Sequence, residues 1–159
     1  MSIESPPINT VITDASCFII LDKIDGLFVL ESLFSRVITT PEIAAEYGKR
    51  LPAWVEVRAV GNRDLLYDYT ERVDIGEASA IALASEVPSP LLIIDDLAGR
   101  KLADQLHLDY TDTLGVLIIA RQQHIIDELR SYFDRIRATN FRVPERLLST
   151  LEATYDASK

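Results

Sequence analysis

Short apolar runs alternate with stretches of helical spacing along the whole chain. Apolar runs of strand length occupy residues 11–13, 37–39 and 91–94, and weaker ones occupy residues 54–58 and 108–110. Between these runs, apolar residues recur every three or four positions, which is the spacing of an amphipathic helix. Strands that alternate with helices predict an α/β fold, with a central, mostly parallel sheet of about four to five short strands and helices on both faces.

Prolines and cap residues divide the chain into its predicted elements. Residues 1–10 contain two adjacent prolines, so we expect them to be loosely ordered and residues 11–159 to form a single domain. Ser16 is a candidate N-cap for the first helix. A further helix is predicted over residues 125–138, and its apolar residues cover a broad face.

The composition is that of one globular domain. The chain has 159 residues, of which 48% are hydrophobic and 26% are charged, and its mean hydropathy is +0.11. These values suit a sizeable buried sheet or an oligomer interface. No apolar run approaches the roughly 20 residues of a membrane span, and the first residues lack the basic segment of a signal peptide. We therefore expect a cytoplasmic protein without a membrane partner.

Charge and ligand content limit the chemistry. Cys17 is the only cysteine and the two histidines lie far apart, so a zinc site of thiolates and imidazoles is not expected. The net charge of −9 argues against a general nucleic-acid binder, since phosphate contacts need Lys and Arg. A carboxylate site also makes a chain acidic, however, and its bound divalent ions restore positive charge locally. Any nucleic-acid contact is therefore expected to occupy a small patch.

Two aspartates directly follow predicted central strands. Asp14 comes after residues 11–13, and Asp95 comes after residues 91–94. The carboxyl ends of parallel strands meet at one edge of a sheet, where ligands bind in open α/β folds. Two carboxylates there repel each other unless a cation lies between them, and hard oxygen ligands suit Mg²⁺ or Mn²⁺. A turn or cap role explains a single aspartate at such a place equally well.

Five segments extend this pattern in a fixed order: residues 13–16, 40–46, 76–84, 92–100 and 113–117. Together they resemble the PIN-domain family (PilT N-terminus-like nucleases), in particular a prokaryotic stand-alone branch. The resemblance implies a three-layer α/β/α PIN-like fold. It also implies a set of catalytic acids, which falls on Asp14, Glu46, Glu77, Asp95 and Asp96. All of these except Glu46 are implied metal ligands, with Asp95 preferred over Asp96.

Each implied site residue also has a purely structural explanation. Glu46 pairs with Glu42 on one face of a helix that solvent normally covers, and Glu77 lies near the positive end of its helix. Ser16 matches the family's small hydroxyl residue, which contacts the first acid or the phosphate. Arg100 and Lys101 are candidate phosphate contacts, or else an exposed helix face. Asp112 stands where the branch usually has glycine, which puts full activity in question.

The resemblance implies a metal-dependent ribonuclease that uses Mg²⁺ or Mn²⁺ and acts on RNA or other single-stranded nucleic acid. The alternative is a catalytically weak or inactive PIN-like module that binds nucleic acid or has a regulatory role. A haloacid-dehalogenase phosphatase needs an aspartate where Ser16 stands, and the chain has no phosphate-binding glycine loop. Family members often act as the toxin of a toxin–antitoxin pair, so a small antitoxin protein is a further expected partner.

We also expect a homodimer. The broad apolar face of residues 125–138 would need cover, and a monomer covers it only if the last helix packs over it. A dimer would also bring positive charge to the acids, from Arg130, Arg135, Arg137 and Arg142. The alternative is a monomer in which the terminal helices close one core.

Overall fold

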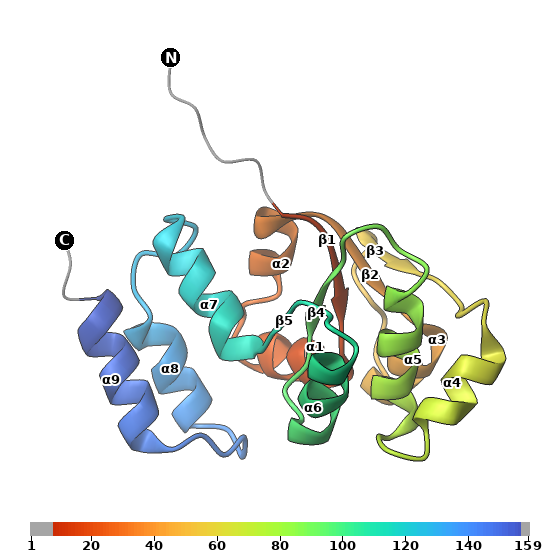
Figure 1. Ribbon diagram of the computed structural model, residues 1–159. Coiled ribbons are helices and arrows are strands. Elements are labelled where there is room, and N and C mark those ends of the chain that lie inside the picture. Colours follow the sequence, from red (N-terminus) through yellow and green to blue (C-terminus); the bar gives the residue numbers. More distant parts are fainter. Residues whose placement is uncertain (1–7, 157–159) are drawn as a thin grey trace.

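The fold is built on one sheet of five parallel strands, seen in a computed structural model that describes residues 8–156 (Figure 1). The strand order is β3-β2-β1-β4-β5. The chain therefore begins in the middle of the sheet, moves outward to one edge, and returns to build the other edge. The strands are β1 (Ile8–Thr13), β2 (Phe34–Thr39), β3 (Val55–Val57), β4 (Leu91–Ile93) and β5 (Tyr110–Thr111).

Helices cover both faces of this sheet, which confirms the predicted three-layer α/β/α arrangement. Helix α5 packs on β1 and β4, with α4 and α6 beside it. On the opposite side lie α1, α2 and α7, with α8 and α9 outermost (Figure 1). The helices are α1 (Ala15–Lys23), α2 (Phe28–Leu33), α3 (Pro41–Tyr47), α4 (Arg63–Tyr69), α5 (Ile75–Ala84), α6 (Leu97–Gln105), α7 (Thr113–Gln122), α8 (Arg130–Arg137) and α9 (Glu145–Tyr155).

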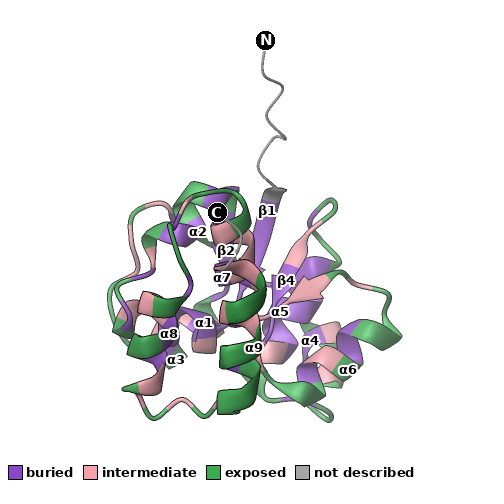
Figure 2. Ribbon diagram, turned by 90° about the vertical axis from the view of Figure 1, so that its left-hand side faces the viewer, coloured by how far each residue is buried: buried purple, intermediate pink, exposed green. Residues whose placement is uncertain are grey.

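The central strands carry the core. Val11 and Ile12 of β1 and Leu92 and Ile93 of β4 are fully buried, because helices cover both faces of the sheet. Figure 2 shows β1 buried and the outer side of α9 exposed. Helix α5 is buried nearly all round, and its small residues let it approach the strands closely. Among the residues that the structure describes, no helix is long and apolar enough to cross a bilayer.

Two predicted boundaries near the N-terminus are wrong. Residues 8–10, expected to be loosely ordered, form the first half of β1, while residues 1–7 lie outside the described residues. The N-cap of α1 is Asp14 and not Ser16. Because β1 ends at Thr13, Asp14 still has extended backbone, and its carboxylate accepts the N–H of Cys17 at 2.9 Å.

The predicted helix over residues 125–138 is also wrong in its first third, since α8 spans only Arg130–Arg137. Asp156, at the end of α9, caps α8 from a distant part of the chain. Its carboxylate accepts the N–H groups of Leu129 at 2.8 Å and Arg130 at 3.0 Å. The helix therefore begins where a long-range hydrogen bond fixes it.

The apolar residues of this segment are covered within one chain. Leu129 and Phe133 are fully buried, and Ile136 is nearly so. The expectation that α8 leaves an uncovered apolar face is therefore wrong, and this face no longer argues for a homodimer. Two of the arginines that a dimer was expected to supply are also engaged elsewhere. Arg137 pairs with Asp134, Glu145 and Glu152, and Arg135 donates to the Ile24 carbonyl at 2.8 Å.

Candidate metal and active site

The sheet reverses its order between β1 and β4, and the two strand-end aspartates meet there. Asp14 follows β1 directly, and Asp95 lies two residues beyond the end of β4. The backbone N–H of Asp95 donates to the Asp14 carboxylate at 3.0 Å. In open α/β sheets, the point of reversal beyond the carboxyl ends of the strands is where ligands bind. The predicted pair of acids therefore lies at the place where this fold forms its sites.

Asp14 is a buried carboxylate that stays close to other acids. Its pKa is raised from 3.8 to about 8, first by burial and then by the negative charges of Asp95 and Glu46. The backbone N–H groups of Cys17 and Asp95 lower this pKa in part, because each donates to the ionised carboxylate. The two hydrogen bonds also fix the direction in which the Asp14 carboxylate points.

Glu77 approaches the same region from the first turn of α5. Its pKa is raised from 4.5 to about 9 by burial, by a hydrogen bond to Asp74, and by the charges of Asp74, Asp96 and Asp14. Asp74 caps α5 and accepts the N–H of Glu77 at 3.0 Å, and its own pKa is lowered by its hydrogen bonds with Glu77.

Asp74 is a member of the acidic group that the sequence motifs did not indicate. Its spacing from Glu77 is that of a capping box, in which an N-cap residue precedes a glutamate by three positions. That spacing was the available signal, although it indicates a helix start rather than an acidic cluster. The structure adds Asp74 to the acids that surround Glu77.

Glu46 lies at the rim of this acidic group. It is exposed on α3, and its pKa is raised by partial burial and by the charge of Asp74. A Cβ atom at Gly76 would lie 2.7 Å from the Glu46 Oε1 atom, so a side chain at this position would displace this carboxylate from the first turn of α5. Thr40 and Ser79 join the same two helices through a hydroxyl–hydroxyl hydrogen bond of 2.6 Å.

The carboxylates of Asp95 and Asp96 accept hydrogen bonds from different helices. The Asp95 carboxylate accepts the backbone N–H of Thr113 at 2.8 Å and its hydroxyl at 2.7 Å. The Asp96 carboxylate caps α6, where it accepts the N–H groups of Ala98 and Gly99 at 3.1 and 3.3 Å. Thr113 therefore orients Asp95. Its contact joins residues 18 apart in sequence, and no local pattern predicts it.

The remaining predicted residues lie around these acids. Arg100 donates to the backbone carbonyl of Asp95 at 3.0 Å and lies 3.5 Å from the Asp112 carboxylate. Asp112 caps α7 by accepting the N–H of Gly115 at 2.7 Å. Asp112 thus has a structural role and a cationic partner. Lys101 is exposed on α6, and Ser16 is half-buried at the start of α1.

The donor chemistry of the site suits a hard divalent cation. The acids offer only carboxylate oxygens, which Mg²⁺ and Mn²⁺ prefer. Such a cation would relieve the repulsion that raises the pKa values of Asp14 and Glu77. Within residues 8–156, however, no three His, Cys, Asp or Glu side chains converge closely enough to hold an ion as they stand.

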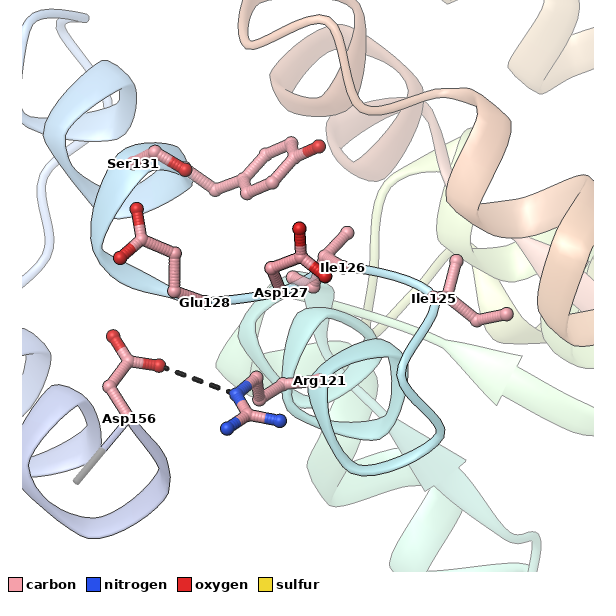
Figure 3. A pocket seen from close by; sticks show the side chains of 8 residues that line it. Arg121, Ile125, Ile126, Asp127, Glu128, Ser131 and Asp156 are labelled. Carbon is pink, nitrogen blue, oxygen red and sulfur yellow. Dashed lines mark ion pairs between the residues drawn. The ribbon is translucent and has the colours of Figure 1, made fainter. Parts of the chain in front are cut away.

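A cavity also lies away from these acids. It has a volume of about 630 Å³ and is lined by residues at the end of α7, before and within α8, and at the end of α9 (Figure 3). Arg121 and Asp156 face each other there at 3.6 Å. None of the predicted acids lines this cavity, and the same Asp156 caps α8. Its polar groups thus join the C-terminal helices.

One comparison identifies the class of protein. The family model described as a PIN domain matches residues 10–155, which is nearly the whole chain. The chain therefore belongs to the PIN-domain family, whose fold is of the nuclease type. No curated protein and no solved structure matches the chain.

Proposed function

We propose that this protein cleaves phosphodiester bonds of RNA with the help of Mg²⁺ or Mn²⁺. The observation that carries the proposal is the meeting of Asp14 and Asp95 at the reversal point of the sheet, with Glu77, Asp96 and Glu46 around them. Carboxylates gathered at this position repel one another, and their common use in proteins is to hold a divalent cation.

The acidic residues and Thr113 would have different roles in this reaction. Asp14 and Asp95 would hold the cation together with Glu77 and Asp96, and Thr113 fixes the direction of Asp95. A bound divalent ion supplies an activated water and neutralises charge on the phosphate. Near pH 7 the carboxyl groups of Asp14 and Glu77 retain protons, because their pKa values are about 8 and 9. They would release these protons on binding the ion.

Cleavage of a labelled single-stranded RNA in the presence of Mn²⁺ tests the proposal. The wild-type protein should cleave it, and a chelator should stop the reaction. Asp14→Asn should abolish cleavage, whereas Asp68→Asn, an exposed change on α4, should leave the rate unaltered. Equal cleavage by wild type and Asp14→Asn would show a contaminating nuclease and refute the proposal.

A PIN-like module without turnover is the second candidate. It is favoured by one observation, namely that no three metal-ligating side chains of residues 8–156 converge as they stand. This candidate binds RNA with the same surface but shows no cleavage at any concentration of Mn²⁺. Metal binding measured without cleavage would favour it over the enzyme.

We extend the proposal to location and partners. The protein would act in the cytoplasm, as a homodimer, and under the control of a small antitoxin protein. Since the structure buries the apolar face of α8, the dimer now rests on the family resemblance. Sedimentation at micromolar concentration tests the dimer, and a measured mass of 17.8 kDa, that of the monomer, would contradict it.

A further inference from the structure

A smaller cavity of about 300 Å³ opens beside the candidate site. It lies between α1 and the segment that joins α8 to α9, and it shares Ser16 and Glu46 with the acidic site. Glu46 is close enough to Asp14 for its charge to act there. The cavity therefore adjoins the candidate site through Ser16 and Glu46.

One face of α1 forms the floor of this groove. Ser16, Ile19, Ile20 and Lys23 line it, and their spacing of three, four and seven residues places them on one side of the helix. With a rise of 1.5 Å per residue, Ser16 and Lys23 are about 10 Å apart along the axis. The groove therefore leads away from the acids and ends at a lysine.

Two cationic side chains line the groove. Lys23 and Arg142 both line it and are both exposed. The Lys23 ammonium donates to the Asn140 side chain at 3.3 Å, which joins α1 to the opposite wall. In residues 8–156, neither cation lies within ion-pair distance of a carboxylate, whereas Arg137 contacts three. These two charges are thus available to an anionic ligand.

An aromatic ring completes the wall. Phe141 lines the groove and is half-buried, and its backbone N–H donates to the Thr139 hydroxyl at 3.1 Å, which fixes the segment. Proteins that hold single-stranded nucleic acid combine a cationic groove with aromatic side chains on which bases stack. A volume of about 300 Å³ is at the low end of small-ligand sites, enough for a nucleotide but not for a base pair.

We propose that this groove binds the single-stranded RNA segment next to the phosphodiester that is hydrolysed at the acidic site, with Lys23 and Arg142 on its phosphates and Phe141 stacked on a base. The inference rests on the proposed ribonuclease function. The two cations of the groove supply positive charge for RNA within one protomer, although the net charge of the chain is −9.

The test measures the binding of a fluorescein-labelled single-stranded oligoribonucleotide by anisotropy. The parent protein is Asp14→Asn with chelator, which should not cleave the probe. Adding Phe141→Ala should weaken binding about tenfold. Adding Lys23→Ala or Arg142→Ala should lower the slope of log Kd against log salt by about one each. Arg130→Ala is the matched control, because it is exposed at the opposite end of α8.

Circular dichroism should show that each variant is folded, and Lys23→Glu repeats the test with a reversed charge on an exposed side chain. Groove variants that bind with the parent's affinity and salt slope would overturn the inference, as would a parent that binds no RNA or binds duplex equally well. If wild type cleaves RNA and the groove variants keep its KM, the proposed role of the groove is refuted and the ribonuclease proposal is supported. If wild type does not cleave RNA but RNA binding depends on the groove residues, the ribonuclease proposal is refuted and RNA binding by the groove is supported.

Discussion

Replacing Asp14 by asparagine should stabilise the metal-free protein at neutral pH. The change removes a buried carboxylate whose pKa is raised to about 8 by burial and by Asp95 and Glu46. The asparagine side chain would keep an oxygen for the N–H of Cys17. It would lose the second oxygen, which in wild type accepts the N–H of Asp95 at 3.0 Å. The outcome depends on which of these effects is larger.

The pKa values give the sign and size of the gain. Because the folded state of wild type holds the Asp14 proton and the unfolded state releases it above its pKa of 3.8, folding stability falls as pH rises from about 4 to about 8. At about 1.36 kcal/mol per pH unit, this group costs about 2 kcal/mol at pH 5 and about 4 kcal/mol at pH 7. The lost hydrogen bond costs about 1–3 kcal/mol at either pH. Asp14→Asn should therefore be nearly neutral at pH 5 and stabilising at pH 7.

Urea unfolding with a chelator present, at pH 5 and pH 7, measures this difference. Wild type should lose about 2–3 kcal/mol more than Asp14→Asn over this range. Asp68→Asn, exposed on α4, should follow wild type. An equal loss of stability in wild type and Asp14→Asn would refute the reasoning, because it would mean that Asp14 does not keep its proton in the folded state.

Three other substitutions test separate parts of the account. Thr113→Val should cost about 1–3 kcal/mol of stability in urea unfolding and weaken Mn²⁺ binding, because it removes the hydroxyl that Asp95 accepts; unchanged metal affinity would contradict its orienting role. Gly76→Ala should lower the cleavage rate by displacing Glu46 from α5, and a rate equal to wild type would place Glu46 outside the site. Leu129→Ala should cost about 2–5 kcal/mol independently of protein concentration, whereas a concentration-dependent loss would indicate a dimer core.

Most of the fold could be predicted from the sequence because parallel strands leave a strong local pattern. Residues 91–94 are apolar without interruption, since both faces of β4 are covered, and Asp95 follows them. The proline at the start of α3 and the positive φ of Gly48 at its end match the expected helix signals. The positions of Asp14 and Asp95 at the ends of apolar runs were sufficient to predict that both lie at one edge of the sheet.

Most of the errors arise where a contact between distant parts of the chain decides the structure. Apolar residues continue at helical spacing before Arg130, but the carboxylate of Asp156 caps α8 from 26 residues away. Asp14 and Ser16 are both good cap residues, and only the end of β1 decides between them. The contacts that orient the acids, such as that of Thr113 with Asp95, likewise leave no local trace.

The most direct test of the central claim is calorimetric titration of Mn²⁺ into the metal-free protein at pH 7, in two buffers of different ionisation enthalpy. If these carboxylates hold the ion, Mn²⁺ should bind with release of about one proton or more, because Asp14 and Glu77 are protonated beforehand. Asp14→Asn should bind more weakly and release fewer protons, and Asp68→Asn should match wild type. Absence of binding, or binding that Asp14→Asn leaves unchanged in affinity and proton release, would contradict the account.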